Sequence, residues 1–327
     1  MQALQVATGD QGIHCLIKEL PMPQAGPGEV LIRARWSSIN YKDALAATGA
    51  GKIMKTLPLT GGVDVAGTVA ASQDARYKEG DAVLVTGYGL GVEVDGGFAE
   101  YVKVSADWVV PLPAGLTDFQ AMALGTAGFT AGLAILRMEQ NGLMPGQGPV
   151  MVTGATGGVG SLAVDMLAGL GHQVTALSGK ADQADYLKGL GAVEVMDRHS
   201  LEMGERPLEK ALWAGAVDSV GGKTLAWLTR TMAYRGVIAS CGLAGGIELN
   251  TTVMPFILRG VSLLGIDSVA CPMAQRLEVW RRLATDLKPR HLETGIARTV
   301  PLVQLPGVFQ GFLDGTVTGR TVVDLGN

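Results

Sequence analysis

The hydrophobic and polar positions in the first third of the chain follow the pattern of short β-strands. In residues 28–38, GEVLIRARWSS, apolar side chains alternate with polar ones, as in a strand with one buried face. Segments 67–72, 80–87 and 98–113 contain comparable apolar runs, and Gly, Asp and Pro turn signals separate them. Short strands at this spacing predict a small, barrel-like β domain.

After about residue 124 the pattern changes to an alternation of strands and helices. Residues 149–154, PVMVTG, form an apolar run, and from residue 159 onward apolar side chains recur with the spacing of one helix face. A second strand is expected at 172–178 and a second helix at 181–190, with further strands after them. This alternation predicts an α/β fold with a doubly wound parallel sheet covered by helices on both faces.

The last part of the chain is expected to contain one amphipathic helix, at 275–287, and to close with GRTVVDLGN as a strand that returns to the first domain. A length of 327 residues favours two domains. We therefore expect one domain to combine residues 1–123 and 269–327, and the parallel-sheet domain to occupy residues 124–268.

Composition and charge narrow the function classes. The chain is 47% hydrophobic with a net charge of −4 and has no Lys/Arg run, so nothing points to nucleic acid. The uncharged stretch 119–136 approaches the length of a membrane span, but its Gln, Thr and Gly residues favour a buried helix. Three widely spaced cysteines and a start without signal-peptide character favour a reducing compartment. We expect a cytoplasmic protein with a small-molecule substrate and no membrane partner.

The most informative segment is the glycine turn VTGATGGVGS at 152–161. In a dinucleotide-binding fingerprint, small residues stand where the chain turns, where backbone meets pyrophosphate, and where helix packs on strand. The register that fits runs from Ala155, in place of the first glycine, to Gly160. Because the turn follows a strand and opens an amphipathic helix, it predicts a nicotinamide dinucleotide site. The alternative is a glycine-rich turn without a ligand.

The end of the second strand indicates which dinucleotide binds. NAD sites usually have Asp or Glu there, which accepts hydrogen bonds from the ribose hydroxyls. This chain has Ser178, Gly179 and Lys180 instead, and Arg198 follows the next strand. A hydroxyl and cations would bind a 2′-phosphate that a carboxylate would repel, so the sequence predicts NADPH. The alternative is that Lys180 and Arg198 are only solvated charges.

A second group of candidates lies in WSSINYKDALAATGAGK, residues 36–52, where Tyr41, Lys42 and Asp43 are adjacent. They could belong to an active site, a metal site or a solvated turn. We expect Lys42 and Asp43 to form a local ion pair or to bond to a turn, and Asp64 to bond to backbone. For Tyr41 the residues alone leave two alternatives: an active-site tyrosine, or one that caps the β-domain core with its hydroxyl in water.

The chain lacks the residues of a zinc site. The region 86–103 has no cysteine, whereas a structural zinc lobe needs four closely spaced ones. Without zinc there is no Lewis acid to polarise an alcohol or carbonyl, so alcohol oxidation is not expected. No histidine shows ligand spacing, and each is expected to be an ordinary surface or packed residue: His14, His172, His199 and His291.

Together these motifs resemble the medium-chain dehydrogenase/reductase superfamily over nearly the whole chain. The matching strings include GEVLIRARWSSINYKDAL, GGVDVAGTV, GDAVLVTG, GGFAEYVKV, GTAGFTA, GATGGVG and GRTVV. The strings WSSINYKDALAATGAGK, ALSGK, CGLAGG and TTVMPFILRGVSLLGIDS are similar to the acrylyl-CoA reductase branch, earlier grouped with quinone oxidoreductases. Zinc-dependent members have a Gly-His-Glu motif where this chain reads Gly62-Val63-Asp64.

The resemblance implies a GroES-like β domain built from both chain ends, a Rossmann domain between them, and a homodimer. It also implies NADPH-dependent reduction of the conjugated double bond of a short enoyl-CoA, acryloyl-CoA to propanoyl-CoA, with NADPH:quinone oxidoreduction as the alternative. Tyr41 is the implied catalytic residue, as a cofactor contact first and a proton donor second. The implied cofactor contacts are Tyr41, Thr156, Gly157, Gly158, Val159, Ser178, Gly179, Lys180, Arg198, Leu243, Ile257, Ser268 and Asn327.

Overall fold

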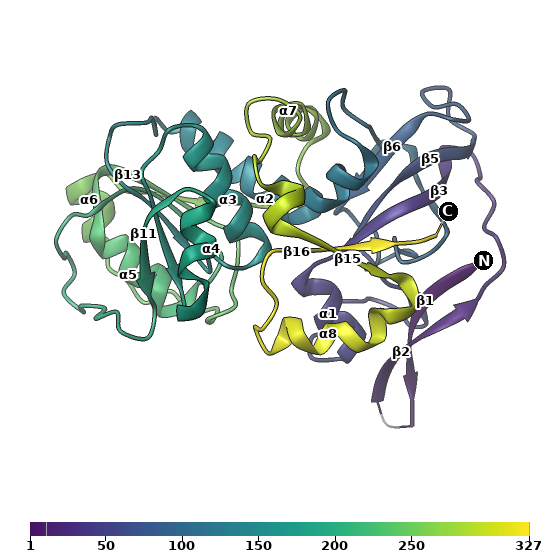
Figure 1. The fold of residues 1–327 in the computed structure, drawn as a ribbon, viewed down its shortest axis with the longest axis horizontal. Helices are drawn as coiled ribbons and strands as arrows, with labels where there is room; N and C mark the ends of the chain where they lie inside the picture. The colour runs from purple at the N-terminus through teal and green to yellow at the C-terminus, as the bar shows by residue number, and fades with distance from the viewer. Residues whose placement is uncertain (11, 327) are drawn as a thin grey trace. The chain divides into compact units, whose positions relative to one another are not determined.

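The structure is a computed structural model that describes residues 1–10 and 12–326. The chain folds into two compact units (Figure 1). The first unit comprises Met1–Thr126, Val269–Leu277 and Ile296–Asn327. The second comprises Ala127–Ser268 and Glu278–Gly295.

The first unit contains two sheets. The larger is seven-stranded, in the order β15-β16-β3-β5-β6-β8 with β7 paired to β3, and the smaller has the order β2-β1-β4. The strands are β1 (Gln2–Gly9), β2 (Gly12–Glu19), β3 (Glu29–Ile39), β4 (Leu59–Thr60), β5 (Asp64–Ser72), β6 (Ala82–Thr86), β7 (Tyr101–Ser105), β8 (Val110–Pro111), β15 (Ala297–Pro301) and β16 (Arg320–Asp324). The helices wholly within this unit are α1 (Tyr41–Thr48), η1 (Ala106–Trp108), η4 (Leu302–Gln304) and α8 (Leu305–Leu313).

The C-terminal segment returns to the first unit as the sequence predicts. Strand β16 pairs antiparallel with β3, so that Val322 lies opposite Ser38 (Figure 1). The alternating apolar residues of β3 and β5 enter a core that Phe98 and Phe309 complete. The two chain ends therefore build one β domain.

The second unit is a doubly wound α/β domain. Its six strands are parallel and lie in the order β11-β10-β9-β12-β13-β14. Because parallel crossovers are right-handed, the reversal of direction at β9 and β12 places α3 and α4 on one face and α5 and α6 on the other (Figure 1). The elements are β9 (Val150–Thr153), α3 (Gly158–Gly169), β10 (Val174–Ser178), η2 (Ala181–Gln183), α4 (Ala184–Gly189), β11 (Ala192–Asp197), β12 (Trp213–Asp218), α5 (Gly222–Thr231), β13 (Met232–Ser240), α6 (Met254–Arg259) and β14 (Ser262–Gly265).

Among the described residues, two α-helices contribute residues to both units. Helix α2 (Asp118–Gln140) is the buried helix expected from its apolar stretch, and backbone at Gly125 (φ 52°, ψ −156°) interrupts it. Among the described residues it is the one helix long and apolar enough to cross a membrane, and 83% of its most apolar window is buried. Its length and composition therefore reflect packing inside the protein.

Helix α7 (Met273–Leu283) begins and ends earlier than the predicted 275–287. Residues 278–295, which were expected in the β domain, pack in the second unit instead. The reason is that the Trp280 ring stacks with Phe129, while Val279 and Leu283 lie against Gly132 of α2. The π-helical turn η3 (Leu292–Ile296) follows.

Candidate functional site

The glycine turn of the second unit has the geometry that the fingerprint requires. Strand β9 ends at Thr153, Gly154 has a φ of 58°, and α3 begins at Gly158. A Cβ on Gly160 would lie 2.6 Å from the Cα of Ala155, so only glycine lets the helix pack this closely on the turn. The N-cap residue Gly157 offers no side chain to the first-turn amides, which leaves them available to an anion.

The residues expected to select the nucleotide come together at the ends of β10 and β11. The Ser178 hydroxyl is buried, accepts the Lys180 backbone N–H at 3.0 Å, and lies 3.4 Å from the hydroxyl of Thr156. The Ser178 carbonyl accepts the Arg198 backbone N–H at 2.8 Å. The turn after the second strand and the turn after the third are thus joined by a backbone hydrogen bond.

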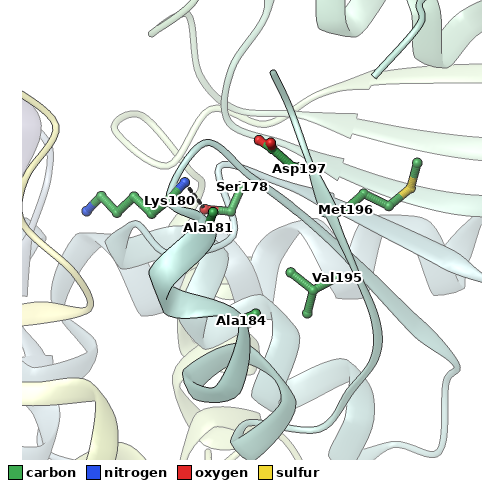
Figure 2. Close-up of a pocket in the computed structure, with 7 residues that line it drawn as sticks. All are labelled: Ser178, Lys180, Ala181, Ala184, Val195, Met196 and Asp197. Carbon is green, nitrogen blue, oxygen red and sulfur yellow. Dashed lines mark hydrogen bonds between the residues drawn. The ribbon is translucent and has the colours of Figure 1, made fainter. Parts of the chain in front are cut away.

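A small pocket of about 120 Å³ opens beside this junction (Figure 2). Figure 2 shows the Lys180 side chain extending away from the Asp197 carboxylate. The pocket wall combines polar groups of the strand ends with apolar side chains of α4 and β11, and its lining residues are Ser178, Lys180, Ala181, Ala184, Val195, Met196 and Asp197. A mixed wall of this kind suits a ligand with both an apolar and a charged part.

Two side chains converge on Gly179, and only one of them, Arg198, was predicted to be a site residue. A Cβ on Gly179 would lie 2.9 Å from Nη2 of Arg198 and 3.1 Å from Nε2 of His199. The prediction for His199 was an ordinary surface or packed residue. The one sequence signal for His199 is its position directly after Arg198, at the end of a strand of the parallel sheet.

The remaining predicted contacts of this unit lie farther along the chain. Leu243 and Ile257 are 59% and 71% exposed, which is unusual for large apolar side chains. The Leu243 backbone lies against Gly221, the residue that precedes α5. Ser268 follows β14, and Asn327 lies outside the described residues.

Asp218 and Cys241 have structural roles in this unit. Asp218 ends β12 and accepts the backbone N–H of Gly221 at 2.9 Å and the hydroxyl of Thr153 at 2.7 Å, so it caps the turn before α5. Burial raises the pKa of the Cys241 thiol to about 12, which keeps it protonated and unreactive.

In the first unit, Tyr41 is the first residue of α1 and is 45% exposed. Of the two alternatives predicted for Asp43, an ion pair or a hydrogen bond to a turn, the structure shows the second. It accepts the Asn40 backbone N–H at 2.8 Å and the Val63 backbone N–H at 3.1 Å. Because Asp43 is buried, its pKa is raised to about 7. These bonds fix the helix start that presents Tyr41.

Asp64 is the centre of a buried polar network just below this helix. Its carboxylate accepts the hydroxyl of Ser38 at 2.7 Å, the side-chain amide of Asn40 at 2.7 Å, and both the N–H and hydroxyl of Thr126. Arg320 lies 3.9 Å away, and burial lowers the pKa of its guanidinium. Asp64 thus bonds mainly to side chains, where backbone partners were expected.

The Asp64 carboxylate is consequently a poor metal ligand. Its oxygen atoms are already occupied by hydroxyl and amide donors. Within residues 1–10 and 12–326, no three His, Cys, Asp or Glu side chains are grouped as a metal ion would require.

Comparison with protein families finds two matches along the chain. The alcohol dehydrogenase GroES-like domain matches residues 26–114, and the zinc-binding dehydrogenase family matches residues 158–285. The first match falls in the β domain and the second mainly in the parallel-sheet unit. The acrylyl-CoA reductase AcuI of Ruegeria pomeroyi is 49% identical over 94% of both chains. YhfP of Bacillus subtilis, whose name places it provisionally among quinone oxidoreductases, is 50% identical over 99% of this chain and 98% of YhfP.

Solved structures show the same similarity over the full length. The yhdH oxidoreductase of Salmonella enterica in complex with NADP is 48% identical, with a TM-score of 0.96 over 99% of this chain and 100% of that one. The Bacillus subtilis YhfP structure with NAD bound is 49% identical, with a TM-score of 0.96 over 99% of both chains. Similar proteins of this fold thus bind either form of the nicotinamide coenzyme.

Proposed function

The chain belongs to the medium-chain dehydrogenase/reductase superfamily, and we propose that it uses NADPH to reduce the conjugated double bond of a short enoyl-CoA. Acryloyl-CoA, reduced to propanoyl-CoA, is the first substrate to test. The observation that carries the proposal is the turn Ser178-Gly179-Lys180 with Arg198 beside it, where an NAD-specific site would have a carboxylate. The 49% identity to an acrylyl-CoA reductase supports the substrate class.

We propose that the pyrophosphate binds at the start of α3 and the 2′-phosphate at the end of β10. The uncapped amides of α3 supply donors for the first, and Ser178, Lys180 and Arg198 supply a hydroxyl and two cations for the second. The proposed contacts are those implied by the family resemblance: Tyr41, Thr156, Gly157, Gly158, Val159, Ser178, Gly179, Lys180, Arg198, Leu243, Ile257, Ser268 and Asn327.

Bound NADPH would supply the hydride for the β-carbon of the enoyl thioester. Negative charge then develops on the thioester oxygen, and a hydrogen-bond donor there lowers the barrier. We propose Tyr41 for this place, as a coenzyme contact and as donor to the substrate or to a water. Its hydroxyl is carried on an exposed helix start that Asp43 and Asn40 hold in position.

We propose that the reaction needs no zinc. A conjugated thioester accepts hydride at carbon, so the developing charge can be met by hydrogen-bond donors instead of a Lewis acid. The full use of Asp64 by internal donors supports this reading.

A homodimer through the edge of the six-stranded sheet is the assembly we propose. Strand β14 ends that sheet, and the nearby surface exposes Val253 by 66% and Leu258 by 52%. Light scattering should give twice the mass of one chain, and a single-chain mass would refute the assembly. A cytoplasmic location stays a prediction.

The runner-up function is an NADPH:quinone oxidoreductase, which YhfP's name favours. Steady-state assays with acryloyl-CoA, crotonyl-CoA and free quinones separate the two. The enoyl-CoA proposal expects a kcat/KM for acryloyl-CoA well above that for any quinone. Turnover of quinones without turnover of either enoyl-CoA would select the runner-up.

A further inference from the structure

A second nitrogen-bearing side chain, His199, borders the turn at Gly179 and has no role in the function proposed above. We infer that His199 is a specificity-determining residue, whose Nε2 binds the 2′-phosphate of NADPH beside the guanidinium of Arg198. The inference deepens the proposed coenzyme preference and rests on it. It assigns a ligand contact to a histidine that the sequence pattern marks as ordinary.

The first support is convergence. Nη2 of Arg198 and Nε2 of His199 come from successive residues after β11, yet both approach the same point above Gly179. Successive side chains in an extended segment normally point to opposite sides. Here a turn redirects them, because the His199 backbone N–H donates to Oδ1 of Asp197 at 2.9 Å.

The second support is the lack of an internal partner. Across the described part of the chain, the side chains of Arg198 and His199 form no hydrogen bond or ion pair, and both residues are exposed. Other arginines of the same unit bond to carboxylates or carbonyls, as Arg282 does to Glu139 and Arg259 does to Met232. Two nitrogen donors held side by side without an acceptor suit an anionic ligand.

The third support is the glycine itself. Gly179 does not need glycine for its backbone conformation, since its φ is outside the left-handed region. An added Cβ would instead lie about 3 Å from the two nitrogen atoms and would push both side chains away. Glycine therefore lets both tips lie close to the turn backbone, next to the buried Ser178 hydroxyl, at the end of the second strand where the fingerprint places the residue that contacts the ribose.

The charged groups around His199 favour an anion there. The Arg198 guanidinium beside it is positive, and one oxygen of the negative Asp197 already accepts the His199 amide. A phosphate dianion would therefore meet the Arg198 guanidinium and the imidazole Nε2, with Lys180 proposed above as a further cation and the Asp197 charge partly engaged by backbone.

The test measures the dissociation constants of NADPH and NADH for the whole protein. Binding is monitored through the fluorescence of the coenzyme, without acyl substrate. His199→Ala should weaken the binding of NADPH by about three- to tenfold and change the binding of NADH by less than about twofold, since an exposed contact to the charged phosphate is lost. His199→Glu should weaken NADPH further. Val193→Glu, which adds the same charge at an exposed position near the start of β11, is the control and should leave the ratio unchanged.

A second pair of measurements distinguishes loss of the phosphate contact from a folding defect in the variant. Competition by 2′,5′-ADP should weaken in His199→Ala, whereas competition by 5′-AMP should not. Gly179→Ala, which keeps the Arg198 and His199 side chains but adds a methyl against their nitrogen atoms, should also lower the preference for NADPH over NADH. If His199→Ala keeps the wild-type ratio, or weakens both coenzymes equally, the inference is overturned.

These outcomes separate the inference from the proposed function. A wild-type protein that prefers NADPH while the His199 variants keep that preference contradicts only the role of His199. A wild-type protein that binds NADH as tightly as NADPH contradicts the proposed coenzyme preference, and the role of His199 with it. Loss of the enoyl-CoA assignment leaves the binding ratios, and hence this test, intact.

Discussion

Two groups of polar residues, one in each unit, differ in whether the protein satisfies them itself. The buried network around Asp64 pairs its carboxylate with Arg320, Asn40 and Thr126, so no charge is left over. The cluster at Gly179 instead presents the tips of Arg198 and His199 to solvent without an acceptor among the described residues. The first arrangement stabilises the fold, and the second supports the anion site proposed above.

The largest expected effect comes from breaking the buried network. Asp64→Ala would leave Arg320 buried without its carboxylate, which should lower the free energy of unfolding by about 3–5 kcal/mol. Arg35→Met is the control, because it breaks an ion pair with Asp324 whose side chains are about one third exposed. Its cost should be at most about 1 kcal/mol. Equal losses in urea unfolding would contradict the role given to Asp64.

A smaller effect follows from the titration of Asp43 beside that network. Its folded-state pKa of about 7 is above the ordinary value of about 3.9. The stability due to protonated Asp43 is therefore complete below pH 4 and is lost as the pH rises through 7. The free energy of unfolding should fall by about 3 kcal/mol between pH 4 and 7.5.

The variant Asp43→Asn measures how much of this pH dependence of the free energy of unfolding comes from Asp43. The variant should lose most of the pH dependence, and the remainder would come from groups such as Asp218, whose pKa is also raised by burial. Unfolding curves at several pH values measure both proteins. A wild-type slope that persists unchanged in the variant would show that Asp43 does not titrate in this range.

A charge change at the exposed cluster around Gly179 should alter the coenzyme preference and leave the free energy of unfolding unchanged, in contrast to the buried network. Lys180→Glu should raise the KM for NADPH by about tenfold or more, because a carboxylate repels the 2′-phosphate, and should affect NADH far less. Lys188→Glu, an exposed lysine on α4, makes the same charge change as a control. Equal changes for both coenzymes would remove Lys180 from the 2′-phosphate site.

The parts of the fold that depend on local sequence could be predicted. The glycine turn, its helix and the second strand follow from hydrophobic spacing and from small residues within a short stretch, and the structure confirms them. The C-terminal strand was also predictable, because GRTVVDLGN has strand character.

The parts that depend on distant contacts could not be predicted. Ser38, Asp64 and Arg320 become neighbours only once β3, β5 and β16 form one sheet, and no local pattern indicates that pairing. The packing of residues 278–295 on α2 has the same origin. For His199, the direction of the side chain depends on a hydrogen bond to Asp197 that residue spacing does not reveal.

The most direct measurement of the central claim is the fate of the hydride. Acryloyl-CoA would be incubated with NADPH deuterated at either face of C4, and the propanoyl-CoA product analysed by mass spectrometry and NMR. The account predicts one deuterium from one of the two labelled coenzymes, located on C3 of the propanoyl group, with metal chelation leaving the rate unchanged. No propanoyl-CoA, a product without label at C3, or loss of turnover on removing zinc would contradict it.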